Sequence, residues 1–526
     1  MIAAQALLAT LTGAGVEVCF MNPGTSEMQF VHALDSAAAM RGVLTLFEGV
    51  ATGAADGYAR ISGRPAAVLL HLGPGLGNGL ANLHNARRAR SPVVCIVGAH
   101  ATGHARYDAP LQSDVEALAR TVSGWVHTSG TGRELAGDAA RAVAATSRDG
   151  GQVATLIIPA DVSWSSGGPP APPRPAARSE PAAAAALEAA AALLTVNEPA
   201  AMLLGGKALT ERGLRAASRI AAATGARLLA ETFPAAMECG AGVPAVPRIA
   251  YLPEQADQQL AGLSQLILAG ARAPVSFFAY PGRPGDLVPG GCSVTELADP
   301  GQDAEAALER LAERLAGGPD SRPPPAVPAP AAAPPSARAL PPGPLTAVSM
   351  AAVIAASLPD RAIVVDEAIT SGFALPQALA AAARHTLLTL TGGAIGQGLP
   401  VATGAAIAAP DRPVLAVEAD GSALYTIQAL WTQAREQLNV TTVLINNAAY
   451  AILRLELART GAAAAGPRAA RMLDLSDPTV KFTQVAAGFG VPGTRVSTAA
   501  ELDAALRRAY GEPGPHLIEA MIPPAA

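Results

Sequence analysis

The stretch from Val414 to Tyr450 carries the pattern that decides the fold. It reads Val414-Leu-Ala-Val-Glu-Ala-Asp420-Gly-Ser-Ala-Leu-Tyr-Thr-Ile-Gln, and after a helix-compatible stretch it continues Thr442-Val-Leu-Ile-Asn-Asn447-Ala-Ala-Tyr450. Each part begins with an apolar run typical of a buried parallel strand, and Asp420 and Asn447 follow these runs. Because neighbouring parallel strands end at the same edge of an α/β sheet, both side chains are predicted to lie at the edge where such sheets bind ligands.

The oxygen atoms at this edge suit a metal ion that holds a phosphorylated ligand. Asp420 offers a carboxylate, Asn447 an amide oxygen and Ala449 a backbone carbonyl, and Mg²⁺ accepts such ligands together with phosphate oxygens. Gly421 and Ser422 open the helix after Asp420, so its free N–H groups are expected to face a diphosphate. The pattern therefore predicts Mg²⁺ and a phosphorylated cofactor, with Asp420, Asn447 and Ala449 as the metal ligands.

The composition indicates a large soluble protein. Of its 526 residues, 50% are hydrophobic and 15% charged, so about three domains with large buried sheets are expected. The net charge of −5 and the absence of basic runs argue against a nucleic-acid partner. The four cysteines are widely spaced, as in reduced cytosolic proteins. The N-terminus lacks a basic n-region and no apolar run is long enough for a bilayer, so we expect a cytoplasmic enzyme without a membrane partner.

Two proline-rich stretches divide the chain. They cover about residues 165–181 and 317–344, and they are predicted to be extended linkers because proline interrupts helices and central strands. The remaining blocks are residues 1–164, 183–316 and 345–526. Strand-like and helix-like runs alternate in each block, which predicts three α/β domains with doubly wound parallel sheets.

The middle block has a glycine pair, Gly205-Gly206, after a strand-like run. The full Gly-x-Gly-x-x-Gly pattern of a dinucleotide-binding loop is missing, so a tight turn between a strand and a helix is the favoured interpretation. Binding of FAD is therefore not expected.

The segment around Asp420 resembles the diphosphate–magnesium signature of thiamine-diphosphate-dependent enzymes, which is usually written Gly-Asp-Gly-Ser followed by Asn-Asn. The likeness is to the branch that contains benzoylformate decarboxylase, pyruvate decarboxylase and acetolactate synthase. It covers essentially the whole chain, and it implies pyrimidine-binding, middle and diphosphate-binding domains in that order, with thiamine diphosphate and Mg²⁺ as cofactors. Ala419 stands where the family usually has glycine, and Tyr450 is counted among the expected cofactor contacts.

Glu48 is the residue to which the resemblance gives the central catalytic role. In Phe47-Glu48-Gly-Val it matches the family's glutamate that contacts N1′ of the aminopyrimidine ring. The resemblance implies that Glu48 acts as a general acid and base through the cofactor. Leu44, Leu46 and Phe47 are expected to form an apolar wall around its carboxyl group.

Two further segments resemble the substrate side of benzoylformate decarboxylase. In Asn-Pro-Gly-Thr25-Ser-Glu, Thr25 falls at the position of that enzyme's serine and is expected to hold the substrate carboxylate. His71 falls at the position of an active-site histidine, a residue suited to relaying protons near neutral pH. A second histidine of that enzyme has no counterpart, and Phe277, Phe278 or Tyr280 stands in its neighbourhood. Protonation after CO₂ loss is then less assisted, which leaves carboligation to a second carbonyl compound open.

Weaker resemblances place other residues at the cofactor. Thr370 or Ser371, after a strand-like run, is expected to donate to a diphosphate oxygen. In Gly-Gly393-Ala-Ile395-Gly, the carbonyl of Gly393 is expected to contact the exocyclic amine of the cofactor. Ile395 is expected to be the hydrophobic wedge between the cofactor rings, with core packing as its alternative role.

The resemblance implies decarboxylation of a small-molecule 2-oxo acid, with carboligation to an aldehyde or other carbonyl compound as a second outcome. The active site is expected between the first block of one subunit and the third block of another, in a homodimer or homotetramer. His71 favours the decarboxylase branch, and Pro110-Leu111 replaces a Phe-Gln pair of acetolactate synthases. Acetolactate synthase, 2-hydroxyacyl lyase and a cofactor-binding protein without catalysis are the alternatives. Glu456, at an aromatic position of benzoylformate decarboxylase, has no assigned role.

Overall fold

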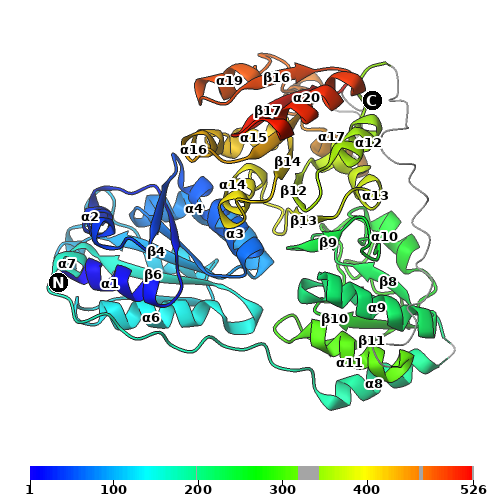
Figure 1. Cartoon of the computed structure of the whole chain (residues 1–526), viewed down its shortest axis with the longest axis horizontal. Coiled ribbons are helices and arrows are strands. Elements are labelled where there is room, and N and C mark those ends of the chain that lie inside the picture. The colour runs from blue at the N-terminus through cyan, green and yellow to red at the C-terminus, as the bar shows by residue number, and fades with distance from the viewer. Residues whose placement is uncertain (197, 318–342, 461–465, 524–526) are drawn as a thin grey trace.

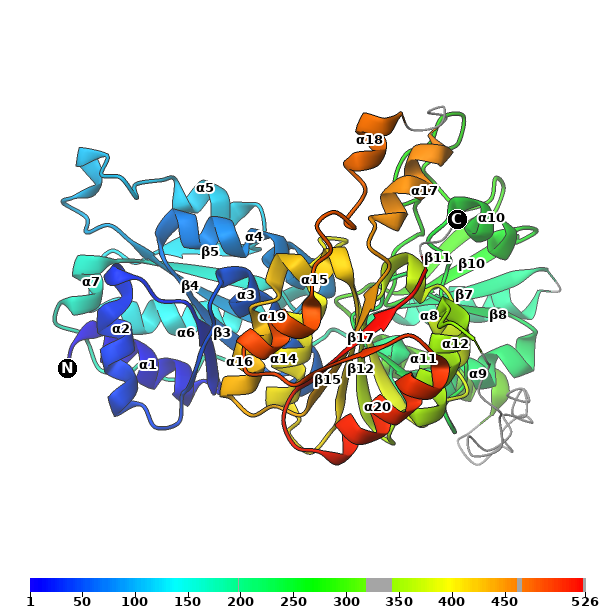
Figure 2. The same ribbon diagram turned by 90° about the horizontal axis from the view of Figure 1, so that it is seen from above.

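The computed structural model describes residues 1–196, 198–317, 343–460 and 466–523. They form three α/β domains whose parallel sheets are flanked by helices, which confirms the predicted fold class (Figure 1). The third domain lies between the other two, as two perpendicular views show (Figure 2). Within the described residues, no helix is both long and apolar enough to cross a lipid bilayer.

The first domain contains six parallel strands in the order β2-β1-β3-β4-β6-β5. The strands are β1 (Val18–Met21), β2 (Arg41–Leu44), β3 (Ala66–Leu70), β4 (Val93–Ala99), β5 (Trp125–Thr128) and β6 (Val153–Pro159). The helices are α1 (Ala3–Gly13), the 3₁₀ helix η1 (Thr25–Glu27), α2 (Met28–Ala33), α3 (Glu48–Ser62), α4 (Leu72–Ala89), α5 (Val115–Arg120), α6 (Leu135–Thr146) and α7 (Ala160–Trp164). The apolar runs predicted β1, β3, β4 and β6. They did not predict β2 and β5, because β2 is exposed at its start and β5 is only half-buried.

The middle domain has four parallel strands in the order β11-β10-β7-β8. The strands are β7 (Ala200–Leu204), β8 (Arg227–Ala230), β10 (Gln265–Ala269) and β11 (Ser293–Ala298). The helices are α8 (Ala184–Thr195), α9 (Glu211–Thr224), α10 (Pro253–Leu260) and α11 (Ala304–Ala316). A Cβ atom on Gly205 would lie 2.7 Å from the carbonyl oxygen of Gly270. The pair Gly205-Gly206 is thus a tight turn packed against the end of β10, as the sequence favours.

The third domain has six parallel strands and one antiparallel edge strand, in the order β16-β17-β15-β14-β12-β13-β9. The strands are β9 (Met237–Cys239), β12 (Ala362–Glu367), β13 (His385–Thr389), β14 (Val414–Ala419), β15 (Val440–Asn446), β16 (Gly493–Val496) and β17 (His516–Met521). The helices are α12 (Ala347–Ser357), the 3₁₀ helix η7 (Ile369–Gly372), α13 (Leu375–Leu379), α14 (Gly398–Ala408), α15 (Asp420–Thr426), α16 (Ala429–Arg435), α17 (Ala451–Arg459), α18 (Pro467–Arg471), α19 (Phe482–Gly488) and α20 (Ala499–Gly511).

The edge strand β9 comes from the middle block of the sequence. It pairs antiparallel with β13, with Cys239 opposite His385 and Met237 opposite Leu387. The boundaries expected from the proline-rich stretches do not anticipate this crossing, because a strand of three residues carries no readable periodicity. Blocks 183–316 and 345–526 therefore share one sheet.

The first proline-rich stretch has the extended character that the sequence predicts. Between α7 and α8 the chain forms no helix or strand, only single bridge pairs such as Ile2 with Ser166. It runs along the surface from the first domain to the middle domain (Figure 1). Most of the second stretch, residues 318–342, lies outside the described residues.

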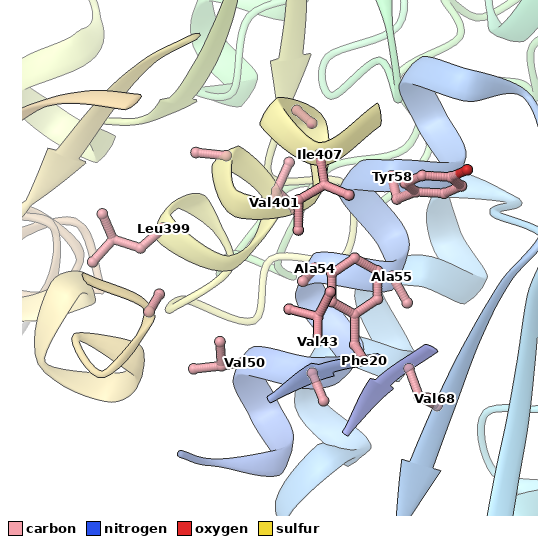
Figure 3. Packing of buried hydrophobic residues seen from close by; sticks show 14 of the residues in the cluster. Phe20, Val43, Val50, Ala54, Ala55, Tyr58, Val68, Leu399, Val401 and Ile407 are labelled. Carbon is pink, nitrogen blue, oxygen red and sulfur yellow. The ribbon is translucent and has the colours of Figure 1, made fainter. Parts of the chain in front are cut away.

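The first and third domains pack through α3 and α14 at two glycines. A Cβ atom on Gly57 would lie 2.1 Å from the carbonyl oxygen of Val401, and one on Gly404 would lie 1.8 Å from that of Ala54. The two helices therefore approach to backbone contact, which only glycine permits. Apolar side chains of both helices, including Ala54, Tyr58 and Val401, complete one shared core (Figure 3).

A buried ion pair lies at the same interface. Arg60 and Asp56 on α3 pair with side chains that are 2% and 0% exposed. Gln397, just before α14, donates to Asp56 at 3.0 Å, and Arg60 donates to the carbonyl of Thr389 at 2.9 Å. Both charges of the first domain thus find hydrogen-bond partners on the third, which holds α3 and α14 in one register.

We expect Gly404→Ala to destabilise the protein, because the new methyl group meets the backbone of α3. The expected loss is about 1–3 kcal/mol, the usual cost of overpacking, seen as a lower midpoint in scanning calorimetry. Gly137→Ala on α6 is the matched control, because a Cβ there has no neighbour within 4 Å. Alanine is preferred to glycine in a helix by about 1 kcal/mol, so the control should be neutral or stabilising. Equal midpoints for the two variants would contradict the close approach.

Candidate active site

Asp420 and Asn447 lie at the carboxyl ends of adjacent strands, as the sequence predicts. β14 and β15 pair in parallel, Asp420 begins α15, and Asn447 directly follows β15. Oδ2 of Asp420 accepts a hydrogen bond from the N–H of Ala448 at 2.8 Å, and Oδ1 accepts one from the N–H of Gly421 at 2.8 Å. The start of α15 and the turn after β15 are therefore in direct contact through the Asp420 carboxylate.

The oxygen atoms at this edge fit a Mg²⁺ ion. Asp420 supplies a carboxylate that is 3% exposed, and Oδ1 of Asn447 accepts a hydrogen bond from the N–H of Ala449 at 3.0 Å. Across the described chain, no group of three or more His, Cys, Asp or Glu side chains is placed to hold a metal. A site here would combine one carboxylate with amide and carbonyl oxygens. That donor set suits a hard cation that keeps water and phosphate oxygens in its shell.

Tyr450 packs against the start of α15. A Cβ atom on Gly421 would lie 2.4 Å from Cε1 of the Tyr450 ring, so the ring occupies the space that glycine leaves. Ser422, in the same helical turn, is buried. Burial raises the pKa of Tyr450, so its hydroxyl stays protonated near neutral pH. Contacts of these three residues with a cofactor remain predictions.

Thr370 and Ser371 lie at the same edge of the third sheet. They belong to η7, which follows β12, the neighbour of β14. Ser371 is buried and Thr370 is half-buried. Neither hydroxyl forms a hydrogen bond with another described residue, so both are available to donate to a ligand.

Backbone strain is found beside the predicted site residues. Of eight non-glycine residues with positive φ in the described chain, Leu72 (47°), Ile369 (50°) and Ala448 (53°) directly adjoin a predicted site residue. A left-handed conformation costs about 1–2 kcal/mol for a residue with a Cβ atom, and it is rarest for β-branched residues such as Ile369. Strain of this kind gathers at ligand sites, which supports a functional role for this edge.

Asn82 joins the first domain to the glycine-rich loop of the third domain within one chain. Its side-chain amide donates to the carbonyl of Gly49, next to Glu48, at 2.8 Å and to the carbonyl of Gly396 at 3.2 Å. Asn85, one turn later on α4, donates to the same glycine-rich loop at 2.8 Å. The sequence interpretation missed both asparagines, because polar residues on a helix are usually solvent-facing.

Gly393 and Ile395 lie on that loop, between β13 and α14. Gly393 has φ 75°, and a Cβ atom there would lie 2.4 Å from the ring of Phe277. Ile395 is half-buried and belongs to none of the hydrophobic cores of the described chain. Core packing, the alternative role for Ile395, is therefore disfavoured, and its role as a wedge remains a prediction.

Two buried glutamates lie beneath this loop on the sheet side, and the sequence interpretation assigned neither of them. Glu367 and Glu418 occupy paired positions on β12 and β14. Glu367 accepts hydrogen bonds from the N–H groups of Gly396, at 2.6 Å, and Gly398. Neither oxygen of Glu418 has a hydrogen-bond partner among the described residues. Burial raises the pKa of both carboxyl groups, and Glu367 raises that of Glu418 further, so the negative charge is favoured on Glu367.

Glu48 begins α3 and is 7% exposed. Asn78 on α4 donates to its Oε2 at 3.0 Å, and a Cβ atom on Gly75 would lie 3.2 Å from its Oε1. The apolar wall expected around Glu48 is incomplete, because Leu46 is 43% exposed. The amide of Asn78 contacts the carboxyl group, and Gly75 leaves free the space that a side chain would fill beside it.

His71 pairs with a residue that the sequence interpretation overlooked, Glu27. His71 follows β3, and its Nδ1 lies 2.8 Å from Oε2 of Glu27, which is 4% exposed. Oε2 also accepts the N–H of Gly24 at 2.9 Å. The signal was present in the sequence, since Glu27 lies three residues after Gly24, the spacing of a side chain that reaches back to a helix start.

Thr25 lies near His71 and Glu27, at the edge of the first sheet where its strands have their carboxyl ends. It follows β1, the neighbour of β3, and begins η1. Its side chain is exposed and forms no hydrogen bond with a described residue. The structure therefore brings Thr25, His71 and Glu48 to one edge, with Glu27 added, while their catalytic roles remain predictions.

Aromatic side chains of the middle domain cluster beside the loop that carries Gly393. The Phe277 ring lies 4.8 Å from that of Phe278 and 5.3 Å from that of Tyr251, measured between centroids. Glu456 on α17 accepts hydrogen bonds from the hydroxyls of Tyr280 at 3.1 Å and Tyr251 at 3.4 Å. The acidic residue without an assigned role thus joins α17 to the middle domain.

Comparisons with known proteins agree with this arrangement. The model of the thiamine pyrophosphate enzyme N-terminal TPP-binding domain matches residues 1–119, and that of the C-terminal TPP-binding domain matches residues 377–520. The chain is 60% identical over 521 residues to a Mycobacterium tuberculosis protein provisionally named as acetolactate synthase large subunit IlvX, covering 99% of each. It is 31% identical over 542 residues to benzoylformate decarboxylase of Pseudomonas aeruginosa, covering 96% of each. Its fold is similar to that of a Rhodococcus jostii 4-hydroxybenzoylformate decarboxylase, with a TM-score of 0.86 and 24% identity over 99% of each chain.

The chain belongs to the thiamine-pyrophosphate-dependent enzyme family. The resemblance read from the segments around Asp420 and Glu48 is confirmed, and the two matched domains contain the two halves of the candidate site.

We expect Asp420→Ala to abolish Mg²⁺-dependent binding of thiamine diphosphate, because it removes the one carboxylate of the proposed metal site. Titration calorimetry with the cofactor, with and without Mg²⁺, measures the change. Asp411→Asn is the control, since Asp411 is an exposed residue before β14, at the opposite edge of the sheet. Undiminished binding by the Asp420 variant would contradict the assignment.

Proposed function

We propose that the protein uses thiamine diphosphate and Mg²⁺ to decarboxylate a 2-oxo acid without oxidation, in the manner of benzoylformate decarboxylase. The observation that carries this proposal is the Glu27–His71 pair beside Thr25 and Glu48 at one sheet edge. When bound, thiamine diphosphate supplies the electron sink that cleavage of the bond to the carboxylate requires.

The residues of the third domain would hold the cofactor. Asp420, Asn447 and the carbonyl of Ala449 hold Mg²⁺, and the free hydroxyls of Thr370 and Ser371 donate to the diphosphate. The N–H groups at Gly421 and Ser422 face the same group, and Tyr450 closes the turn beside them. Gly393 and the half-buried Ile395 would contact the rings, and the buried Glu367 beneath keeps their loop in place.

The residues of the first domain would handle protons and substrate. Glu48 would hold a proton toward the aminopyrimidine ring of a bound cofactor, and Asn78 fixes its carboxyl group. The exposed hydroxyl of Thr25 donates to the substrate carboxylate, and His71 moves a proton to or from the reacting carbon. These roles fit a small-molecule substrate that carries a carboxylate beside a keto group, a 2-oxo acid.

We propose further that the site forms between two subunits of a homodimer or homotetramer. Large apolar side chains are exposed beside both half-sites: Met28 (45%) and Leu46 (43%) on the first domain, and Leu424 (38%) and Tyr425 (54%) on the third. Exposed apolar groups in such positions favour coverage by a second copy.

Co-expression of two inactive variants tests the shared site. Glu48→Gln and Asp420→Ala are each expected to be inactive alone. In a mixed dimer one site carries both substitutions and the other carries neither, so random pairing restores about one quarter of the wild-type activity. No restored activity in mixed dimers would contradict a site shared between subunits.

A second candidate function is acetolactate synthesis. The 60% identity to the Mycobacterium tuberculosis protein provisionally named for that activity favours it. The aromatic Phe277 and Phe278, where benzoylformate decarboxylase brings a second histidine, also favour carboligation over rapid protonation.

A panel of 2-oxo acids with product identification separates the candidates. Our expectation is CO₂ release with an aldehyde as the main product from an aryl 2-oxo acid, and acetolactate from pyruvate would favour the second function instead. Cleavage of 2-hydroxy ketones would indicate a lyase. Absence of turnover on every substrate, with cofactor binding intact, would favour a cofactor-binding protein and refute the proposal.

A further inference from the structure

Glu27 and His71 form a pair that fits only because the neighbouring residues Gly24 and Gly98 have no side chains. A Cβ atom on Gly24 would lie 2.2 Å from the His71 ring, and one on Gly98 would lie 1.7 Å from Oε1 of Glu27. Any side chain at either position would displace the pair. The contact of 2.8 Å between Oε2 and Nδ1 thus depends on residues 24 and 98 being glycines.

The partners of Glu27 set the direction of this hydrogen bond. Oε2 faces two nitrogen atoms, and the Gly24 nitrogen always donates, so a carboxylate oxygen satisfies both when His71 donates from Nδ1. A neutral imidazole with its proton on Nδ1 has an unprotonated Nε2. Within the described chain, Nε2 of His71 takes part in no hydrogen bond.

The surroundings couple the charge of Glu27 to His71. Burial raises the pKa of Glu27, whereas the charge and hydrogen bond of His71 and the N–H of Gly24 lower it. Oε1 of Glu27 has no hydrogen-bond partner among the described residues. His71 is therefore the main group that favours a charged Glu27 in a place that otherwise disfavours charge.

Glu48 lies near His71 but has a separate set of contacts. A Cβ atom on Gly75 would lie 3.2 Å from Oε1 of Glu48 and 3.3 Å from Cβ of His71, so both residues adjoin the same glycine. Glu48 accepts from Asn78, and Glu27 accepts from His71. The two glutamates thus serve different partners.

We propose that Glu27 is a positioning residue that holds His71 in the tautomer with its proton on Nδ1. Nε2 is then the nitrogen that exchanges a proton with the substrate, a step that rests on the proposed function. Glu27 acts only through His71 and does not itself touch the reacting atoms. The same device, a carboxylate that orients an imidazole, is effective in other general-base catalysts.

The tautomer can be measured without cofactor or substrate. Long-range ¹H–¹⁵N spectra of histidine-labelled enzyme, assigned with His71→Ala, are recorded at a pH where His71 is neutral. We expect Nδ1 to be protonated in the wild type and in Glu27→Gln, whose amide oxygen still accepts. Glu27→Met, similar in length but without an acceptor, should lose this preference. Protonation of Nε2 in the wild type, or an unchanged tautomer in Glu27→Met, would overturn the proposal.

A second histidine–glutamate pair supplies the control. Oε2 of Glu512 lies 3.2 Å from Nε2 of His516 at the surface of the third domain. Glu512→Gln should alter the signals of His516 alone and leave turnover unchanged. A shift of the His71 signals in this variant would show that they report global rather than local change.

Kinetics then distinguish positioning from a structural role. We expect Glu27→Met to lower kcat by roughly 10- to 100-fold, less than the roughly 100- to 10,000-fold contribution of a general acid–base group itself, with a smaller change in KM. In a His71→Ala background the same substitution should have no further effect on kcat. An equal loss in both backgrounds would show that Glu27 acts independently of His71 and would refute the proposal.

Failure of the proposed function is separable from failure of this inference. If no 2-oxo acid is decarboxylated, the function falls, while the spectra of the cofactor-free enzyme still decide whether Glu27 sets the tautomer. If turnover is seen but the tautomer and kcat of Glu27→Met match the wild type, the function stands and the inference falls.

Discussion

The backbone contact between α3 and α14 is the constraint on which the relative position of the first and third domains in one chain depends. Glu48 begins α3, and the loop with Gly393 and Ile395 leads into α14. At Gly57 and Gly404 the backbones touch, so neither helix can slide without a clash. Any rotation of one domain on the other would move Glu48 relative to that loop. The side-chain amide of Asn82 donates to both segments, to the carbonyl of Gly49 and to that of Gly396, and so helps to fix the distance between them.

Buried polar groups make this packing specific. An apolar interface of alanines and valines alone would tolerate several registers of α3 on α14, because small side chains fit many ways. The Asp56 carboxylate instead requires Arg60 and Gln397 at defined positions, and a shift would leave a buried charge without partners. Glu418 lacks such partners and is better accommodated as a neutral acid. The buried carboxyl group of Asp56 is thus fully hydrogen-bonded, whereas that of Glu418 has no partner among the described residues.

Much of the fold can be predicted from apolar runs, because a strand buried on both faces of a parallel sheet is a continuous run of apolar residues in the sequence. β4, β14 and β15 are of this kind and were predicted from residue type alone. β2 is exposed at its start and β9 has only three residues, so neither strand forms a long apolar run in the sequence.

The residues of the candidate site likewise fall into those that the sequence predicted and those that it missed. Asp420 and Asn447 directly follow β14 and β15, and the sequence placed both correctly at the edge of the third sheet. Asn82 and Glu27 were missed, because their roles depend on which glycines lie opposite them in space.

The crossing of β9 has a consequence for how the molecule can be divided. β13 would be an unprotected edge of the third sheet if residues 237–239 were absent, and its backbone groups would be open to pairing with other chains. A fragment that begins at the second proline-rich stretch would carry that exposed edge and tend to aggregate. The middle domain thus protects the edge of the third domain by supplying β9. The two domains should therefore be kept together when the protein is truncated, fused or circularly permuted.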